Sequence, residues 1–108
     1  VNPIIQKISP VIMYRAKLNL NPATDEIIEH GYHQDYQPEK FGKLFTSAVF
    51  YLNTNNGYTK FFDGTIVNSV ENRLVTFPST MYHTGSSCTD TKNRLVLNLV
   101  YIEGESFA

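Results

Sequence analysis

Short runs of β-forming residues, each closed by a turn signal, constrain this 108-residue sequence more than any other feature. The runs are rich in Val, Leu, Ile, Phe, Tyr and Thr, which favour extended backbone. The breaks between them carry Asn-Gly, Asp-Gly, Pro-Ser and Gly-Ser-Ser, which are typical of tight turns. The main runs are Val11 to Leu20, Leu44 to Asn53, Tyr58 to Phe62, Thr65 to Ser69, Arg73 to Phe77 and Arg94 to Ile102.

Two shorter runs, Tyr32 to Tyr36 and Met81 to Thr84, bring the prediction to about eight strands. Many short strands with regular turns are typical of a barrel, a sandwich or a jelly roll, and we expect an all-β jelly roll. Only Pro22 to His30 could form a helical turn or two, so at most one short helical segment is expected. Without repeats or a Ser/Gly linker, residues 1–108 are expected to form a single domain.

Composition and charge argue against several classes of protein. A formal net charge of −1 leaves no basic footprint, so the sequence carries no strong nucleic-acid signal. The apolar runs are too short to cross a bilayer, and no membrane partner is expected. Cys88 is the only cysteine, which excludes an intrachain disulfide framework and favours a reducing, cytoplasmic location. The sequence leaves a homo-oligomer open.

His33 and Asp35 form an H-x-D pair within one of the short runs. Residues two apart in a strand project from the same face, so this pair can bind one metal ion together. His83 is the best candidate for a third ligand from another part of the fold. Two imidazoles and one carboxylate leave open positions on a metal, which is the arrangement that non-haem Fe(II) oxygenases use.

The same residues also have simpler interpretations. His33 could pack at a strand end and Asp35 could make an Asx-turn, with no metal involved. His30 competes with His83 for the third ligand position, but in an extended segment it falls on the opposite face from His33 and Asp35. We therefore predict a surface or supporting role for His30.

Arg94 opens the last apolar strand, where alternation places it on one face with Val96, Asn98 and Val100. An arginine is costly to bury unless an anion meets it, and its planar fork fits a carboxylate through two hydrogen bonds. The alternative is an ordinary surface ion pair, for example with Asp90.

Six motifs follow one another in a recognisable order. They are H-x-D at 33–35, FYLN at 50–53, NGYTKF at 56–61, NRLVTFP at 72–78, HTG at 83–85 and Arg94. Together they resemble the motifs of the 2-oxoglutarate and Fe(II)-dependent oxygenase superfamily, especially its prolyl-hydroxylase-like branch. The resemblance extends from about Lys17 to Tyr101 and implies a cupin-like double-stranded β-helix, which is a jelly roll.

Position by position, the resemblance implies that His33, Asp35 and His83 bind Fe(II). It also implies that Arg94, eleven residues after His83, pairs with the distal carboxylate of the co-substrate 2-oxoglutarate. The implied enzyme is a dioxygenase that hydroxylates its substrate and releases succinate and CO2.

Three further residues resemble positions that contact the co-substrate. Tyr51 is similar to a tyrosine whose hydroxyl often binds the same carboxylate, although it could also be an ordinary core tyrosine. Asn19 and Asn21 resemble the Asn-x-Tyr pair of the alkylation-repair demethylases, with Asn21 in place of the tyrosine.

The prime substrate cannot be read from the sequence, and a peptide side chain, a nucleobase and a small metabolite fit equally well. Substrate contacts are expected in the loop Gln37 to Lys43, with Tyr36 and Phe41, and in the hairpin Tyr58 to Asp63. Members of the superfamily carry supporting helices ahead of the barrel, so we expect either a minimal core or a piece of a longer protein. Two other functions stay open: a jelly-roll binding or structural module of a larger assembly, and a cupin-like metalloenzyme that does not use 2-oxoglutarate.

Overall fold

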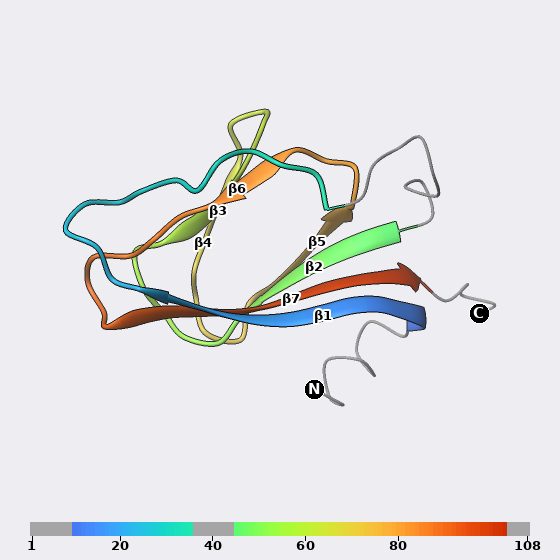
Figure 1. The fold of residues 1–108 in the computed structure, drawn as a ribbon, viewed down its shortest axis with the longest axis horizontal. Helices are drawn as coiled ribbons and strands as arrows, with labels where there is room; N and C mark the ends of the chain where they lie inside the picture. Colours follow the sequence, from blue (N-terminus) through green and yellow to red (C-terminus); the bar gives the residue numbers. More distant parts are fainter. Residues whose placement is uncertain (1–9, 36–44, 104–108) are drawn as a thin grey trace.

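The computed structural model describes residues 10–35 and 45–103, which form an all-β jelly roll (Figure 1). No helix occurs in these two ranges, so none there is long and apolar enough to span a membrane. The strands are β1 (Pro10–Pro22), β2 (Phe45–Tyr51), β3 (Tyr58–Phe61), β4 (Ile66–Asn68), β5 (Leu74–Pro78), β6 (His83–Gly85) and β7 (Asn93–Glu103).

The strands form two antiparallel sheets. The larger sheet has the order β1-β7-β2-β5, and the smaller has the order β4-β3-β6. The segment after β1 runs along the free edge of β6 and joins the smaller sheet through isolated bridges, Glu29 with Ser86 and His33 with His83. Figure 1 shows this segment in cyan beside β6. The two bridges hold this segment against the edge of the smaller sheet without making it a regular strand.

Alternation along the strands divides the apolar residues into two clusters. Val49, Tyr51, Phe61, Phe77 and Val96 form the cluster that joins the two sheets, since its members come from β2, β3, β5 and β7. Side chains that point the other way along β2 and β7 form a second cluster on the opposite face of the larger sheet: Ala48, Leu97, Leu99 and Tyr101. Complete burial of each aliphatic side chain contributes roughly 1.5–3 kcal/mol. The β7 residues Arg94, Val96, Asn98 and Val100 all line the cavity between the sheets, so the prediction that they share one face is confirmed.

The strand predictions are confirmed to within a few residues, except for the run from Tyr32. Residues 23–30 form no helical turn, because side-chain and backbone groups of this segment bond to the loop after β6 instead. Thr24 and Ile28 both bond to the Ser87 hydroxyl, and the Thr24 amide donates to the carbonyl of Cys88. The expected strand from Tyr32 is reduced to the single bridge at His33, and Tyr36 lies outside the described residues.

Candidate metal centre and its cavity

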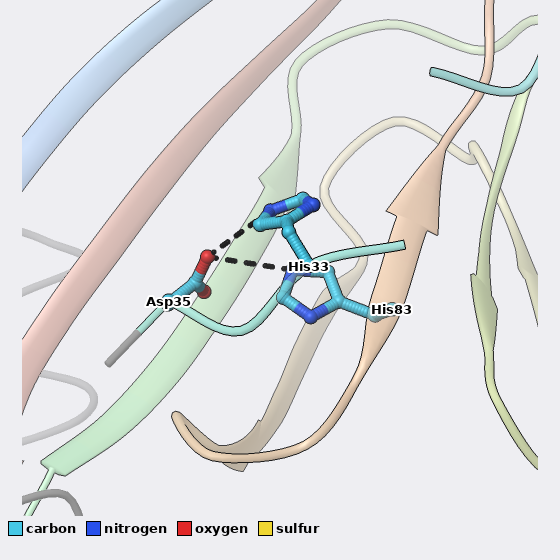
Figure 2. A group of neighbouring side chains, drawn as sticks. All are labelled: His33, Asp35 and His83. Carbon is cyan, nitrogen blue, oxygen red and sulfur yellow. Dashed lines mark ion pairs between the residues drawn. The ribbon is translucent and has the colours of Figure 1, made fainter. Parts of the chain in front are cut away.

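His33, Asp35 and His83 converge on one point, as Figure 2 shows. The Nε2 atoms of His33 and His83 lie 3.3 Å and 3.5 Å from the same oxygen, Oδ1 of Asp35. One ligand atom from each residue lies within 4.8 Å of the other two. The structure thus brings the three predicted residues together, and two nitrogen donors and one carboxylate oxygen at this spacing could hold a single metal ion.

Backbone pairing between residues 30–35 and 79–85 brings the three side chains together. His33 and His83 exchange both backbone hydrogen bonds, and residues directly opposite in an antiparallel pair project from the same face. The rings consequently lie with centroids 4.4 Å apart. Further hydrogen bonds run from His30 N to Gly85 O, from Gln34 Nε2 to Thr80 O and from Asp35 N to Ser79 O. The bridge thus replaces the regular strand in placing His33 and Asp35 on one side.

Each histidine is oriented by a backbone carbonyl. Nδ1 of His83 donates to the carbonyl oxygen of Met81 at 2.9 Å, and Nδ1 of His33 donates to that of Gly31 at 3.2 Å. A carbonyl oxygen can only accept, so Nδ1 carries the hydrogen in both rings and Nε2 is left to bind a cation. Metal-ligating histidines usually have such an outer partner, which fixes the ring and its tautomer.

Burial distinguishes the two histidines. The side chain of His83 is 7% exposed and packs against Phe77 with ring centroids 4.6 Å apart, whereas that of His33 is 55% exposed. Burial lowers the pKa of His83, while a hydrogen bond to Asp35 raises the pKa of His33 against the opposing effect of its partial burial. Burial therefore holds the His83 ring in place and favours its neutral form.

Asp35 is the only carboxylate of the cluster. Burial by itself would raise the pKa of its carboxyl, but hydrogen bonds with His33 and Ser47, together with the nearby His83, hold it below its usual value. An ionised carboxylate beside two imidazole nitrogens is the protonation state that metal binding requires.

The cluster lies in the wall of a cavity of about 320 Å³ between the two sheets. His30 lines this cavity too, so the prediction that it falls on the opposite face from His33 is wrong. The physical reason is Gly31, whose φ of +110° interrupts the extended backbone on which the alternation argument depends. The predicted supporting role of His30 still agrees with the structure, because it does not belong to the three-residue cluster.

Arg94 lines the same cavity and is buried, with 3% of its surface exposed. Its Nε donates to the Ser69 hydroxyl at 3.1 Å and one terminal nitrogen donates to the Tyr58 carbonyl at 3.3 Å. In the part of the chain that the structure describes, no carboxylate lies within ion-pair distance of it, and Asp90 instead accepts from the Asn56 amide. The ordinary ion pair considered above is thus absent there, and the arginine is left with a charge that an anionic ligand would balance.

The absence of a side chain at Gly57 leaves room for the side chain of Arg94. A Cβ atom on Gly57 would lie 2.6 Å from Cδ and 2.9 Å from Nε of Arg94, which is closer than side chains tolerate. The glycine of the NGYTKF motif is therefore required by close packing rather than by its backbone angle.

Two of the three remaining predicted co-substrate residues line the cavity, and the third does not. Asn19 and Asn21 project into it from β1, where Asn21 stands opposite Arg94 in the register. Tyr51 is completely buried and does not line the cavity, and burial raises the pKa of its hydroxyl. That hydroxyl donates to Oγ1 of Thr59 at 2.7 Å, and Thr59 does reach the cavity.

Arg15 and Lys17 also line the cavity and were missed from the sequence. The alternation that pairs Asn19 with Asn21 extends back along β1 to Lys17 and Arg15, so this signal could have found the two basic residues. The expected substrate loop Gln37 to Lys43 lies outside the described residues. In the other expected substrate segment, Tyr58 to Asp63, only Thr59 lines the cavity.

Comparison with known proteins supports the fold. No protein-family model and no curated protein matches the sequence. Among solved structures, the nickel complex of the non-heme monooxygenase ThoJ matches 94% of this chain with a TM-score of 0.67 and 14% identity. A cupin protein from Bacteroides fragilis matches 97% of it with a TM-score of 0.60 and 11% identity. A prolyl-4-hydroxylase from Pseudomonas putida matches 96% of it with a TM-score of 0.58 and 20% identity.

The matches cover a smaller share of these three proteins than of this chain. This chain spans 49% of the monooxygenase, 77% of the cupin protein and 60% of the hydroxylase. At such low identity the similarity concerns the fold alone. The chain therefore has the jelly-roll fold shared by cupins and by oxygenases of the non-heme and prolyl-hydroxylase kinds.

Proposed function

We propose that this chain is the catalytic core of an Fe(II)- and 2-oxoglutarate-dependent dioxygenase that hydroxylates its substrate and releases succinate and CO2. One observation carries the proposal: the cluster of three possible metal ligands shares one cavity of about 320 Å³ with a buried arginine, Arg94, which has no acidic partner among the described residues. Neither feature is needed for a jelly roll to fold, and a buried cation with no anion beside it is a cost to stability.

The donor set fits Fe(II). Two histidine nitrogens and one carboxylate oxygen on one side of an ion leave the other coordination positions open, which is characteristic of non-haem Fe(II) oxygenases. His83 is held by Met81 and by the aromatic ring of Phe77, so it needs little rearrangement to bind. His33 and Asp35 complete the set from the neighbouring segment.

The other end of the cavity fits 2-oxoglutarate. The Arg94 guanidinium would bind the distal carboxylate, with Thr59 and the amides of Asn19 and Asn21 as further polar partners. Tyr51 would act through Thr59, which it orients by its hydrogen bond. A volume of about 320 Å³ lies within the range of small-molecule sites.

The chain's own residues would then perform the binding and positioning. Bound iron supplies the oxidative chemistry, in which 2-oxoglutarate and O2 are converted to succinate and CO2 as one oxygen atom enters a C–H bond of the substrate. Asp35 balances part of the metal's charge, and Arg94 fixes the direction of the oxo-acid. The buried side chains of Val49, Val96 and Val100 form an apolar wall that limits access of water.

The solved structures add support of a general kind. Two of the similar folds belong to a non-heme monooxygenase and a prolyl-4-hydroxylase, so this jelly roll is compatible with oxygenase chemistry. The prime substrate would react in the same cavity.

Uncoupled turnover tests the proposal before the substrate is known. Enzymes of this kind slowly convert 2-oxoglutarate to succinate on their own, so the natural protein that carries this sequence should form succinate only with Fe(II) and O2 present. His33→Ala should abolish the reaction because it removes a metal ligand, whereas His30→Ala, a histidine of the same cavity outside the cluster, should retain it. Suppose instead that the protein binds iron and 2-oxoglutarate but yields no succinate with pools of peptides, nucleotides and metabolites. A binding or structural module would then be the better interpretation.

A further inference from the structure

We propose that Arg15 and Lys17 bind an anionic group, a phosphate or a carboxylate, on the molecule that this cavity accepts beside the metal cluster. This inference rests on the proposed function, according to which the molecule is the substrate of the enzyme. Both side chains line the cavity and both residues are exposed, so they lie on its solvent side.

The sheet register puts these two residues at the metal end of the cavity. Arg15 stands opposite Val100 and Lys17 opposite Asn98, whereas Asn21 stands opposite Arg94. One terminal nitrogen of Arg15 donates to the backbone carbonyl of Asp35 at 3.3 Å, which places the guanidinium directly beside the cluster. A group bound by Arg15 would therefore hold the rest of its molecule close to the metal.

Distance along β1 separates this pair from Arg94. Arg15 is six residues from Asn21, so their Cα atoms lie on the order of 20 Å apart along an extended strand. The two basic residues of β1 therefore lie well along the strand from the position opposite Arg94. Arg15 and Lys17 thus form a second cationic end of the cavity, with a separate ligand group to bind.

The balance of charge points the same way. A divalent metal, the Asp35 carboxylate, a dianionic oxo-acid and the Arg94 guanidinium together carry no net charge. The positive charges of Arg15 and Lys17 remain, and among residues 10–35 and 45–103 neither has an acidic side chain within ion-pair distance. A cavity lined by one sign of charge concentrates ligands of the other sign.

The two side chains suit one anion. Residues two apart on a strand face have Cα atoms about 7 Å apart, and both side chains are long enough to meet at one group between them. Among the described residues, the hydrogen bond of Arg15 to Asp35 occupies one of the five N–H donors of the guanidinium, and the others suit a phosphate or carboxylate. Lys17 adds a flexible point charge.

Nuclear magnetic resonance of the Zn(II)-loaded natural protein can test this inference with simple probes. Methyl phosphate and acetate are titrated separately, with and without saturating 2-oxoglutarate, while the Arg15 Nε–H signal and the backbone amides of β1 are followed. Acetamide serves as the neutral counterpart of acetate. We expect saturable shifts with one or both anions and none with acetamide, and comparison of the anions shows whether phosphate or carboxylate is preferred.

Matched variants assign the effect to the two residues. Lys17→Gln should lower the affinity for the preferred anion by about tenfold, since one charge-assisted contact is lost. The double variant, which combines Arg15→Gln with Lys17→Gln, should lower it further. Lys92→Gln removes an exposed lysine that does not line the cavity and should change nothing. Among the described residues no ion pair joins Lys17 to the metal cluster, so its variant remains informative even if loss of Arg15 disturbs Asp35.

Two results would overturn the inference. Equal anion affinity in Lys17→Gln, in the double variant and in the unchanged protein would remove both residues from binding. A loss of 2-oxoglutarate affinity in the double variant as large as that in Arg94→Ala would make them part of the co-substrate site instead. Failure of the unchanged protein to bind 2-oxoglutarate would contradict the proposed function, whereas anion binding at Arg15 and Lys17 in that same sample would still support this inference.

Discussion

His83→Ala is expected to abolish stoichiometric metal binding. The substitution removes one of only two nitrogen donors in the cluster, and it removes the donor that burial and the Met81 carbonyl hold in place. Loss of an outer-shell partner alone typically lowers metal affinity roughly 10- to 100-fold, so loss of a direct ligand should exceed that range. The measurement is anaerobic reconstitution with Fe(II), followed by metal analysis after desalting.

A second variant and a control separate ligand loss from unfolding. Removal of the His83 ring also removes its packing against Phe77 and Phe61, so thermal unfolding of the metal-free variant is measured alongside. Asp35→Ala removes the carboxylate from a less buried position and should lose the metal as well. His30→Ala should bind normally. Full iron affinity in both His83→Ala and Asp35→Ala would disprove the assignment of the metal ligands.

Arg94→Ala is expected to weaken the binding of 2-oxoglutarate by about a hundredfold or more, because the buried carboxylate of the ligand loses its charge-assisted partner. The affinity for the metal should stay largely intact. Arg94→Lys keeps the positive charge but lacks the planar fork, and should give an intermediate affinity. Tyr51→Phe should have a smaller effect than Arg94→Ala, since its hydroxyl reaches the cavity only through Thr59.

Calorimetric titration of 2-oxoglutarate into the Zn(II)-loaded proteins measures these differences. Arg73→Ala is the matched control, because Arg73 is exposed and lies outside the cavity lining. An unchanged dissociation constant in Arg94→Ala would show that this arginine serves the fold, through Ser69 and the Tyr58 carbonyl, rather than the co-substrate.

Regular strands could be predicted from the sequence because their residues alternate. On β7 the alternation of Arg94, Val96 and Asn98 with leucines identifies the inner face without any knowledge of the partner strands. The same period on β1 places Asn19 and Asn21 on one face, and the register then brings Asn21 opposite Arg94. These predictions succeed because a paired strand leaves only two directions for a side chain.

Irregular segments could not be predicted in this way. The alternation argument for His30 fails at Gly31, whose positive φ changes the direction of the chain. The segment after Pro22, which could have formed a helical turn, forms none because Thr24 and Ile28 bond to Ser87, about sixty residues away. Hydrogen bonds of such long range leave no local pattern in the sequence.

His33 and Asp35 lie together with His83 as expected, but for a different local reason than the one that the sequence suggested. The prediction placed both in a regular strand, whereas the structure has a bridge at His33 and a bend at Asp35. Their convergence depends on pairing with residues 79–85, which also supplies His83. Similarly, the motif tyrosine Tyr51 is buried behind Thr59, because the direction of a side chain within a packed sheet depends on both sheets together.

The central claim is that the metal and 2-oxoglutarate bind in contact within one cavity. Anaerobic titration of the Fe(II)-loaded natural protein with 2-oxoglutarate, followed by visible absorption, tests it most directly, because a charge-transfer band arises only when the oxo-acid binds to the iron. We predict a saturable band that requires both components and is absent in Asp35→Ala. If iron binds at the cluster and no band appears at any 2-oxoglutarate concentration, the claim is contradicted.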